Sequence, residues 1–108
     1  MRKEKLISIK LRGRQRFVRL LGDSTKLRGL CSGLVALQPG DSIGEHKTEN
    51  KEEVLVIIKG NATIHYTKNK SIKAGPNTFI YIPPETVHNV KNSGSKILRY
   101  VYITARVN

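Results

Sequence analysis

Apolar and polar residues alternate over several short segments of the chain. In residues 6–12 the alternation places Ile7, Ile9 and Leu11 on one face, and residues 53–59 are the most strand-like segment of all. A period of two residues is typical of a β-strand with one buried face, whereas an amphipathic helix needs a period near 3.6. Because no segment keeps the helical period over a useful length, the pattern predicts an all-β protein.

Turn-forming residues divide these segments at close intervals. Clusters of glycine, proline and asparagine follow the apolar runs, for example at Pro39-Gly40 and Pro83-Pro84. Short strands separated in this way indicate a sandwich, a barrel or a jelly roll. The predicted strands cover residues 6–12, 16–21, 30–37, 53–59, 62–67, 78–82 and 96–107, with shorter extended segments at 42–48, 71–73 and 86–91.

The length of 108 residues predicts a single domain, and no internal repeat or linker marks a boundary within it. No apolar run approaches the roughly 20 residues that a membrane-spanning helix needs. The basic start of the chain lacks the apolar stretch of a secretory signal, so we expect a cytoplasmic protein with no membrane partner. The single cysteine, Cys31, lies in an apolar stretch and is expected to be a buried structural thiol.

The net charge of +12 is concentrated near the N-terminus, because residues 1–28 hold ten of the 20 basic residues and two of the eight acidic ones. A basic segment of this kind can bind nucleic acid. Here the basic residues alternate with apolar ones, as they do on a strand, and Phe17 is the only aromatic residue of the segment that could stack on a base. We therefore favour a solvated sheet edge over a nucleic-acid partner.

Candidate chemistry is concentrated in residues 46–53 and at His88. His46 and Thr48 are two positions apart on one predicted strand and share a face, and Glu53 opens the next strand. His88 comes from a distant strand, after a turn stiffened by two prolines. Two imidazoles and a carboxylate can hold a divalent metal and leave coordination positions open. A hydrogen-bonded pair of histidines in a water-filled pocket is the alternative interpretation.

The spacing of these residues resembles the first motif of the cupin family, G-x5-H-x-H-x3,4-E-x6-G. Threonine stands in place of the second histidine of that motif. Glu52 is a rival for the glutamate position, but the six residues between Glu53 and Gly60 favour Glu53. The five residues that keep the spacing are Gly40, His46, Thr48, Glu53 and Gly60.

A second segment resembles the second cupin motif, G-x5-P-x-G-x2-H-x3-N. Pro83, His88 and Asn92 stand at its proline, histidine and asparagine. Asn77 and Glu85 replace its two glycines. Asparagine tolerates the left-handed turn conformation, so the exchange of the first glycine is a mild one.

The resemblance is to small single-domain cupins of the conserved β-barrel superfamily and covers residues 33–108. It implies a double-stranded β-helix, the jelly-roll barrel of that family. It also implies that His46, Glu53 and His88 are metal ligands, with Thr48 at the position of the missing fourth ligand. The implied cofactor is a divalent metal, and iron, manganese, nickel, copper and zinc all suit these residues. A threonine hydroxyl is a poor ligand for such metals, so a cupin that has lost its metal is the alternative.

Three functions are compatible with this interpretation. The first is a metal-dependent enzyme acting on a small polar or anionic molecule, similar to the dioxygenases, decarboxylases and sugar isomerases of the cupin family. The second is a metal-free module that binds a small ligand, which the threonine at position 48 favours. The third, a nucleic-acid-associated protein, is the least favoured. Small cupins often dimerise through a sheet edge, so the strand carrying Ile7, Ile9 and Leu11 is expected to join a homodimer.

The last predicted strand adds candidate pocket residues. Arg99 is expected to point outward, so Tyr100 and Tyr102 point into the barrel and are candidate pocket lining. A tyrosine hydroxyl can donate a hydrogen bond to a bound oxyanion, although such residues are more often part of the core. His65 alternates with apolar neighbours and is expected to face outward.

Overall fold

The computed structural model of the protein describes residues 6–22 and 29–107. Within these ranges the chain forms nine β-strands and no helix. All paired strands run antiparallel. The strands are β1 (Phe17–Leu21), β2 (Leu30–Leu37), β3 (His46–Lys47), β4 (Lys51–Lys59), β5 (Ala62–Tyr66), β6 (Lys70–Ala74), β7 (Thr78–Ile82), β8 (Val87–Asn92) and β9 (Leu98–Arg106).

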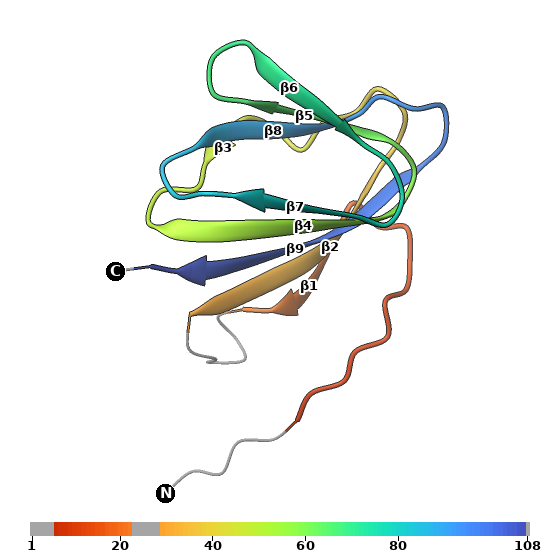
Figure 1. Cartoon of the computed structure of the whole chain (residues 1–108). Helices are drawn as coiled ribbons and strands as arrows, with labels where there is room; N and C mark the ends of the chain where they lie inside the picture. The colour runs from red at the N-terminus through yellow and green to blue at the C-terminus, as the bar shows by residue number, and fades with distance from the viewer. Residues whose placement is uncertain (1–5, 23–28, 108) are drawn as a thin grey trace, which may run out of the picture.

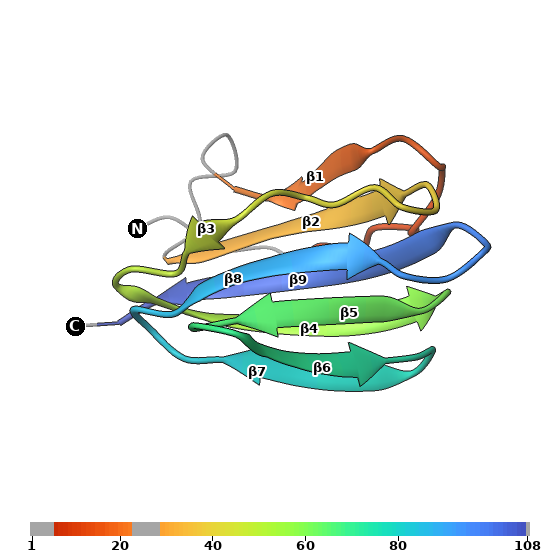
Figure 2. The same cartoon turned by 90° about the horizontal axis from the view of Figure 1, so that it is seen from above.

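Two sheets face each other and enclose the core (Figures 1 and 2). One sheet has five strands in the order β1-β2-β9-β4-β7, and the other has four in the order β3-β8-β5-β6. The chain crosses repeatedly between the sheets, so consecutive strands such as β7 and β8 lie in different layers. This arrangement is a jelly-roll barrel, and the predicted all-β fold class is confirmed. None of the described segments is a helix long and apolar enough to cross a membrane.

The alternation along the strands decides which side chains are buried. In β4, Leu55 and Ile57 point inward and are fully buried, while Val54 and Val56 on the opposite face are only half-buried. The same pattern on the facing strands supplies the partners of these inward side chains. The core consists of Val35, Leu37, Leu55, Ile57, Ala62, Ile64, Ala74, Ile80, Ile82, Val90, Leu98 and Tyr100.

The register of the five-stranded sheet arranges its inward side chains in rows. Glu53 lies opposite Thr104, and Thr104 lies opposite Cys31, so these three residues form one row near the end of the barrel. The next row inward contains Leu55 opposite Tyr102. Polar side chains therefore gather at the end of the barrel where β4 begins and β9 ends, and we call this end the barrel mouth.

Gly60 follows β4 at the opposite end of the barrel. Its φ is +89°, and a Cβ atom on it would lie 2.5 Å from the carbonyl oxygen of Ile97. The backbone can approach this closely only when no side chain stands in the way, which explains the glycine at this position.

Five described non-glycine residues adopt the left-handed conformation that glycine favours, and two of them stand in the second motif. Asn77 has a φ of 64° and Glu85 a φ of 57°, and both stand where the second cupin motif has glycine. The Glu85 amide donates a hydrogen bond of 2.9 Å to the carbonyl oxygen of Glu49, and the Glu85 carboxylate pairs with Lys47 at 3.0 Å. These contacts hold the turn between β7 and β8, which leads into His88.

Two predicted strands have the same bounds as observed strands, and a third was predicted to begin two residues after the observed strand does. The predicted strands at 30–37 and 78–82 coincide with β2 and β7. Strand β4 begins at Lys51, because the residues that resemble a charged turn already pair with β9, with Lys51 opposite Arg106.

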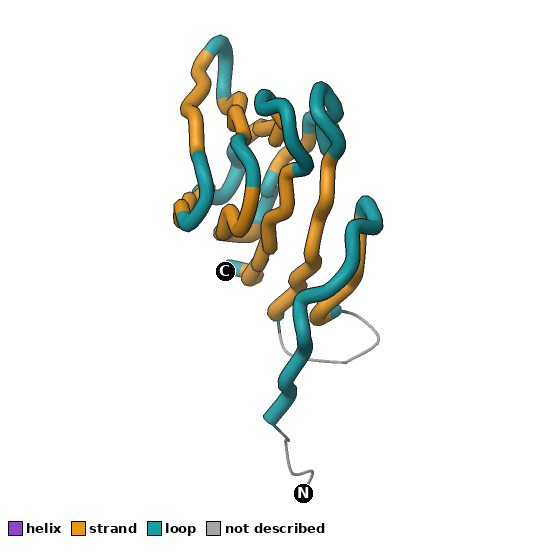
Figure 3. The backbone as a smooth tube through the Cα atoms, turned by 90° about the vertical axis from the view of Figure 1, so that its right-hand side faces the viewer, coloured by secondary structure: helices purple, strands orange, loops and turns teal. Residues whose placement is uncertain are grey.

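The predicted strand at residues 6–12 is wrong. Residues 6–15 form no strand, and they extend away from the two sheets in Figures 1 and 3. Alternation alone does not make a strand, because the backbone needs a neighbour to complete its hydrogen bonds, and none of the described strands pairs with this segment. Its apolar side chains are exposed, Leu6 by 92%. Residues 1–5 and 23–28 of the predicted basic segment lie outside the described residues.

Candidate functional site

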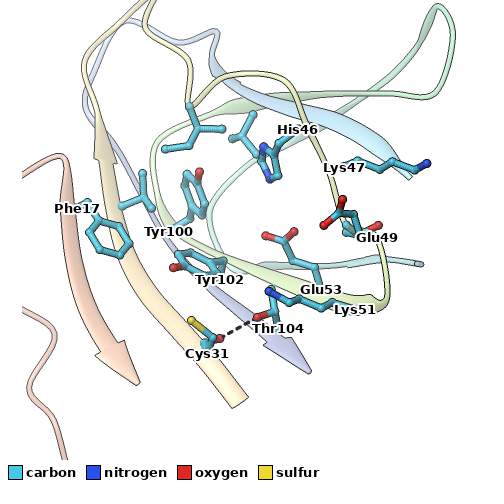
Figure 4. Close-up of a pocket in the computed structure, with 14 residues that line it drawn as sticks. Phe17, Cys31, His46, Lys47, Glu49, Lys51, Glu53, Tyr100, Tyr102 and Thr104 are labelled. Carbon is cyan, nitrogen blue, oxygen red and sulfur yellow. Dashed lines mark hydrogen bonds between the residues drawn. The ribbon is translucent and has the colours of Figure 1, made fainter. Parts of the chain in front are cut away.

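A pocket of about 330 Å³ opens at the barrel mouth between the two sheets (Figure 4). Its size lies at the lower end of the range of about 300–1,000 Å³ that is typical of small-molecule sites. One wall is apolar and aromatic, and the other carries charged and polar groups. The lining residues are Phe17, Cys31, Val35, Ile43, His46, Lys47, Thr48, Glu49, Lys51, Glu53, Val90, Tyr100, Tyr102 and Thr104.

Three potential metal ligands converge at this mouth from three strands. His46 is on β3, Glu53 on β4 and His88 on β8, and one ligand atom from each lies within 4.8 Å of the others. His46 and His88 are direct cross-strand partners, and their ring centroids are 4.2 Å apart at an interplanar angle of 63°. Pairing of β3 with β8 therefore joins the two motifs, although 42 positions separate the two histidines in the sequence.

Hydrogen bonds to the backbone orient both imidazoles in the same way. Nδ1 of His46 lies 3.0 Å from the carbonyl oxygen of Gly44, and Nδ1 of His88 lies 3.0 Å from that of Thr86. A carbonyl oxygen only accepts hydrogen bonds, so each Nδ1 carries the proton and donates it. Each neutral ring then has a free lone pair on Nε2, which is the form that coordinates a metal.

His88 Nε2 is a buried polar atom without a hydrogen bond. The residue is 1% exposed, and Nε2 lies 3.1 Å from Oε1 of Glu53 with no hydrogen bond between the two atoms. Buried polar atoms are rarely left unsatisfied, and those that are call for an explanation. A divalent cation held by Nε2 of both histidines and the Glu53 carboxylate would satisfy this atom, so the residues fit the metal that the resemblance implies.

Electrostatics at His88 depend on its two contacts. Burial lowers the pKa of His88, since it disfavours the charged ring. The contact with Glu53 and the hydrogen bond to the Thr86 carbonyl raise this pKa, and together they outweigh burial, so the net pKa is above the ordinary 6.5. A proton and a metal therefore compete for the same nitrogen.

Thr48, at the position of the missing fourth ligand, has a different role. Its side chain is buried, and its hydroxyl donates a hydrogen bond of 2.8 Å to the carbonyl oxygen of Pro83. The same hydroxyl accepts one of 2.9 Å from the amide of Thr86. Thr48 thus stabilises the turn that positions His88, and both hydrogen bonds of its hydroxyl are made to that turn.

Tyr100 and Tyr102 both line the pocket from β9. Tyr100 is 2% exposed, and burial raises its pKa well above 10.0. Tyr102 is half-buried and stacks on Phe17 of β1 with centroids 6.2 Å apart, and burial raises its pKa too. A Cβ atom on Gly33 would lie 2.6 Å from the Phe17 ring and 2.7 Å from the Tyr102 ring, so this glycine makes room for the aromatic wall.

Cys31 is not the buried structural thiol that its apolar surroundings predict. It is half-buried and lines the pocket, and the Arg19 guanidinium contacts its Sγ. The reason is its place in the fold, because the inward side of β2 faces packed core at one end but faces the pocket at the mouth. Apolar neighbours in the sequence do not distinguish these two ends.

The structure also places the remaining candidates. Glu52 is on the outer face of β4, where it accepts a hydrogen bond of 2.7 Å from the Tyr81 hydroxyl, so it is not part of the cluster. His65 is exposed on β5, as expected. Phe17 and Lys51 line the pocket but were not among the predicted site residues. Lys51 could have been predicted from the sequence, because it is two positions from Glu53 and therefore lies on the same face of the strand.

Comparisons with known proteins agree with this geometry. The sequence pattern of the family described as cupin domain matches residues 33–104. A cupin family protein with a double-stranded β-helix fold from Methanocaldococcus jannaschii is similar at 20% identity, with a TM-score of 0.78 over 95% of this chain and 91% of that one. None of the curated proteins that were compared matches the chain.

Two further solved structures show the same fold. A predicted oxalate decarboxylase from Thermotoga maritima has a TM-score of 0.77 at 21% identity, over 84% of this chain and 79% of that one. The cupin domain of Cnp3 from Schizosaccharomyces pombe has a TM-score of 0.75 at 16% identity, over 92% of this chain and 69% of that one. At these identities the similarity establishes the fold.

Proposed function

Since the chain belongs to the cupin domain family, we propose that its barrel mouth binds a divalent metal through His46, Glu53 and His88 and acts there on a small polar or anionic molecule. The observation that carries this proposal is His88 Nε2, a buried atom with no hydrogen bond that faces a carboxylate and a second imidazole. The backbone contacts of both Nδ1 atoms support it, because they leave Nε2 of each ring with a free lone pair, and the ligand atoms of the three residues lie within 4.8 Å of one another.

The residues around the cluster serve this function in separate ways. The Gly44 and Thr86 carbonyls fix the two rings, and Thr48 braces the turn before His88. The aromatic wall on the opposite side gives part of the pocket an apolar lining. A divalent metal would supply Lewis-acid polarisation of a carbonyl or carboxylate group on the bound molecule. Dioxygenase, decarboxylase and isomerase reactions are the family chemistries to be tested.

Elemental analysis of the purified, untagged protein tests the metal site. The protein is stripped with chelator and reconstituted separately with iron(II), manganese, nickel, copper and zinc. We expect about one metal per chain in the wild type and none in His88→Ala or His46→Ala. His46 is exposed, so loss of metal in its variant is not a consequence of unfolding, which circular dichroism verifies. His65→Ala, on the exposed side of β5, is the matched control and should keep the metal.

A metal-free ligand-binding module is the second candidate function. Two observations favour it: the Thr48 hydroxyl is engaged with backbone groups, and the Glu53 carboxylate lies 3.1 Å from His88 Nε2, close enough to form an ion pair with the protonated ring without a metal. Failure of all five metals to bind the folded wild type would favour this module. Native mass spectrometry of the purified protein would then be used to find a bound small molecule.

We also propose that the protein is a homodimer joined through residues 6–12. The apolar side chains of this segment are exposed in the single chain, Ile7 by 50% and both Ile9 and Leu11 by 44%. A sheet edge of a second copy offers both the ladder partner and the apolar cover that the segment lacks. Light scattering at micromolar concentration should give the mass of a dimer, and deletion of residues 2–12 should give a monomer. A monomeric full-length protein would contradict the proposal.

A further inference from the structure

Two lysines line the pocket, and they differ in their partners. Lys47 pairs with Glu85 at 3.0 Å on the outside of the mouth. Lys51 makes no ion pair and no side-chain hydrogen bond with any described residue. An ammonium group held at a pocket without a protein partner is available to a ligand.

The Lys51 side chain is on the face of β4 that points toward the metal-ligand candidates. Lys51 and Glu53 are two residues apart on β4 and share its inward face. The register places Lys51 opposite Arg106 and Glu53 opposite Thr104, so Thr104 is the diagonal neighbour of Lys51. Figure 4 shows the Lys51 side chain extending below Glu53 with its ammonium end near Thr104. The cationic group therefore lies at one end of the pocket and His46 at the other.

The space between these ends has an apolar, aromatic wall. Phe17, Tyr100 and Tyr102 form it, and the stacking of Phe17 on Tyr102 holds the two rings in place. Aliphatic side chains, those of Val35 and Val90 among them, complete this side of the pocket. Such a wall favours a ligand with an apolar and planar body.

We propose that Lys51 is the anion-recognition residue of the pocket and that the ligand is a small organic acid with an apolar, planar body. Its carboxylate contacts Lys51, and its other end faces His46, Glu53 and His88. The second half of this inference rests on the proposed metal function. The first half does not, because Lys51 can bind a carboxylate whether or not a metal is present.

Charge in the pocket is consistent with this assignment. Glu49 and Glu53 also line it, so an anion without a cationic partner would be repelled. Lys47 is engaged with Glu85, which leaves Lys51 as the unpaired cation among the described lining residues. A bound carboxylate would accept a charge-assisted hydrogen bond from the Lys51 ammonium group, and such a bond is stronger than one between neutral groups.

Benzoate is the probe, because it combines one carboxylate with a planar apolar ring. Its binding is measured by isothermal titration calorimetry on chelator-treated protein and again on zinc-loaded protein. Lys51→Gln should weaken benzoate binding about tenfold or more, and Lys51→Arg should restore most of it. Lys59→Gln is the matched control, since it removes the same charge from the exposed far end of the same strand, outside the pocket lining, and it should leave the affinity within about twofold of wild type. Circular dichroism verifies that each variant is folded.

The outcomes separate this inference from the metal proposal. If zinc does not bind but benzoate binding to the metal-free protein still depends on Lys51, the anion site stands and the metal proposal fails. If zinc binds and benzoate affinity is insensitive to Lys51→Gln, the metal proposal stands and this inference is overturned. Equal weakening by Lys59→Gln and Lys51→Gln, or no benzoate binding to either form of the wild type, would also overturn it.

Discussion

Strand β4 has two halves whose inward side chains differ in character. Leu55 and Ile57 are fully buried among apolar side chains, whereas Lys51 and Glu53 carry opposite charges at the barrel mouth. Both halves follow the same alternation, so both point into the barrel. The comparison teaches that alternation fixes the direction of a side chain, while the residue type at an inward position decides whether it builds core or site.

Breaking the apolar half should have the largest effect. Ile57→Ala removes a fully buried side chain, and such truncations of isoleucine or leucine cost about 2–5 kcal/mol. Urea unfolding should show a loss of stability in this range. Ile58→Ala, on the half-buried outer face, is the control and should cost less than half as much. Equal losses would mean that the two faces of β4 are packed alike.

Removing the hydrogen bonds of Thr48 at the barrel mouth should have the next largest effect. Thr48→Val keeps the side-chain shape but removes the hydroxyl that bonds the Pro83 carbonyl and the Thr86 amide. Leaving such buried groups without partners costs about 1–3 kcal/mol. Thermal unfolding measures this cost, and calorimetric titration should also show weaker metal binding because His88 loses its support. Thr67→Val, at an exposed turn, is the control substitution and should change metal binding little.

The charged half can be tested through the titration of His88. Burial lowers the pKa of His88, but the contacts with Glu53 and with the Thr86 carbonyl together raise it by more than burial lowers it. In the metal-free protein the pKa of His88 therefore exceeds 6.5. A raised pKa means that the protonated pair stabilises the fold below about pH 6.5, and that this contribution is lost as the pH rises through the folded-state value. Glu53→Gln should lower the pKa and diminish the extra stability at acidic pH.

Nuclear magnetic resonance of the ring protons of His88 in chelator-treated protein measures that pKa directly. Thermal unfolding at pH 5.5 and pH 8 measures the stability difference. Glu52→Gln is the matched control, because Glu52 contacts Tyr81 on the outer face of the same strand. An unchanged pKa in Glu53→Gln would show that the two side chains are not coupled.

The smallest effect is expected at the turn beside the mouth. Glu85 has a φ of 57°, a conformation that glycine adopts without strain. Glu85→Gly should stabilise the fold by roughly 0.5–1 kcal/mol, less the contribution of the exposed pair with Lys47. Denaturant unfolding measures the difference, and Glu85→Ala, which loses the ion pair but keeps the strain, should give no gain. A destabilised Glu85→Gly would mean that the ion pair outweighs the strain.

Much of the fold could be predicted from local sequence, because turn residues bound segments that are apolar or alternate in burial. Strand β7 alternates between exposed and buried side chains, and β2 is an apolar run ended by Pro39-Gly40; both match their predicted bounds. Residues 6–12 show the same alternation without a strand, since pairing depends on a neighbour that the segment itself does not encode. The bounds of β4 were missed at Lys51 because its partner, Arg106, lies at the other end of the sequence.

The candidate site could be predicted only in part. The spacing of the two motifs identified His46, Glu53 and His88, and the structure brings their ligand atoms together, while metal binding itself stays a prediction. The role of Thr48 was not predictable, because its partners are backbone groups 35 and 38 positions away. Short-range patterns do not report such contacts.

Cys31 gives the pocket a built-in attachment point. It is the only cysteine of the chain, and it lies half-exposed in the pocket that His46 and Glu53 also line. A thiol-specific fluorophore would therefore label the molecule at one site, inside the cavity of interest. The labelling rate would fall whenever a molecule occupies that cavity, so a compound library can be screened for ligands before any reaction is known.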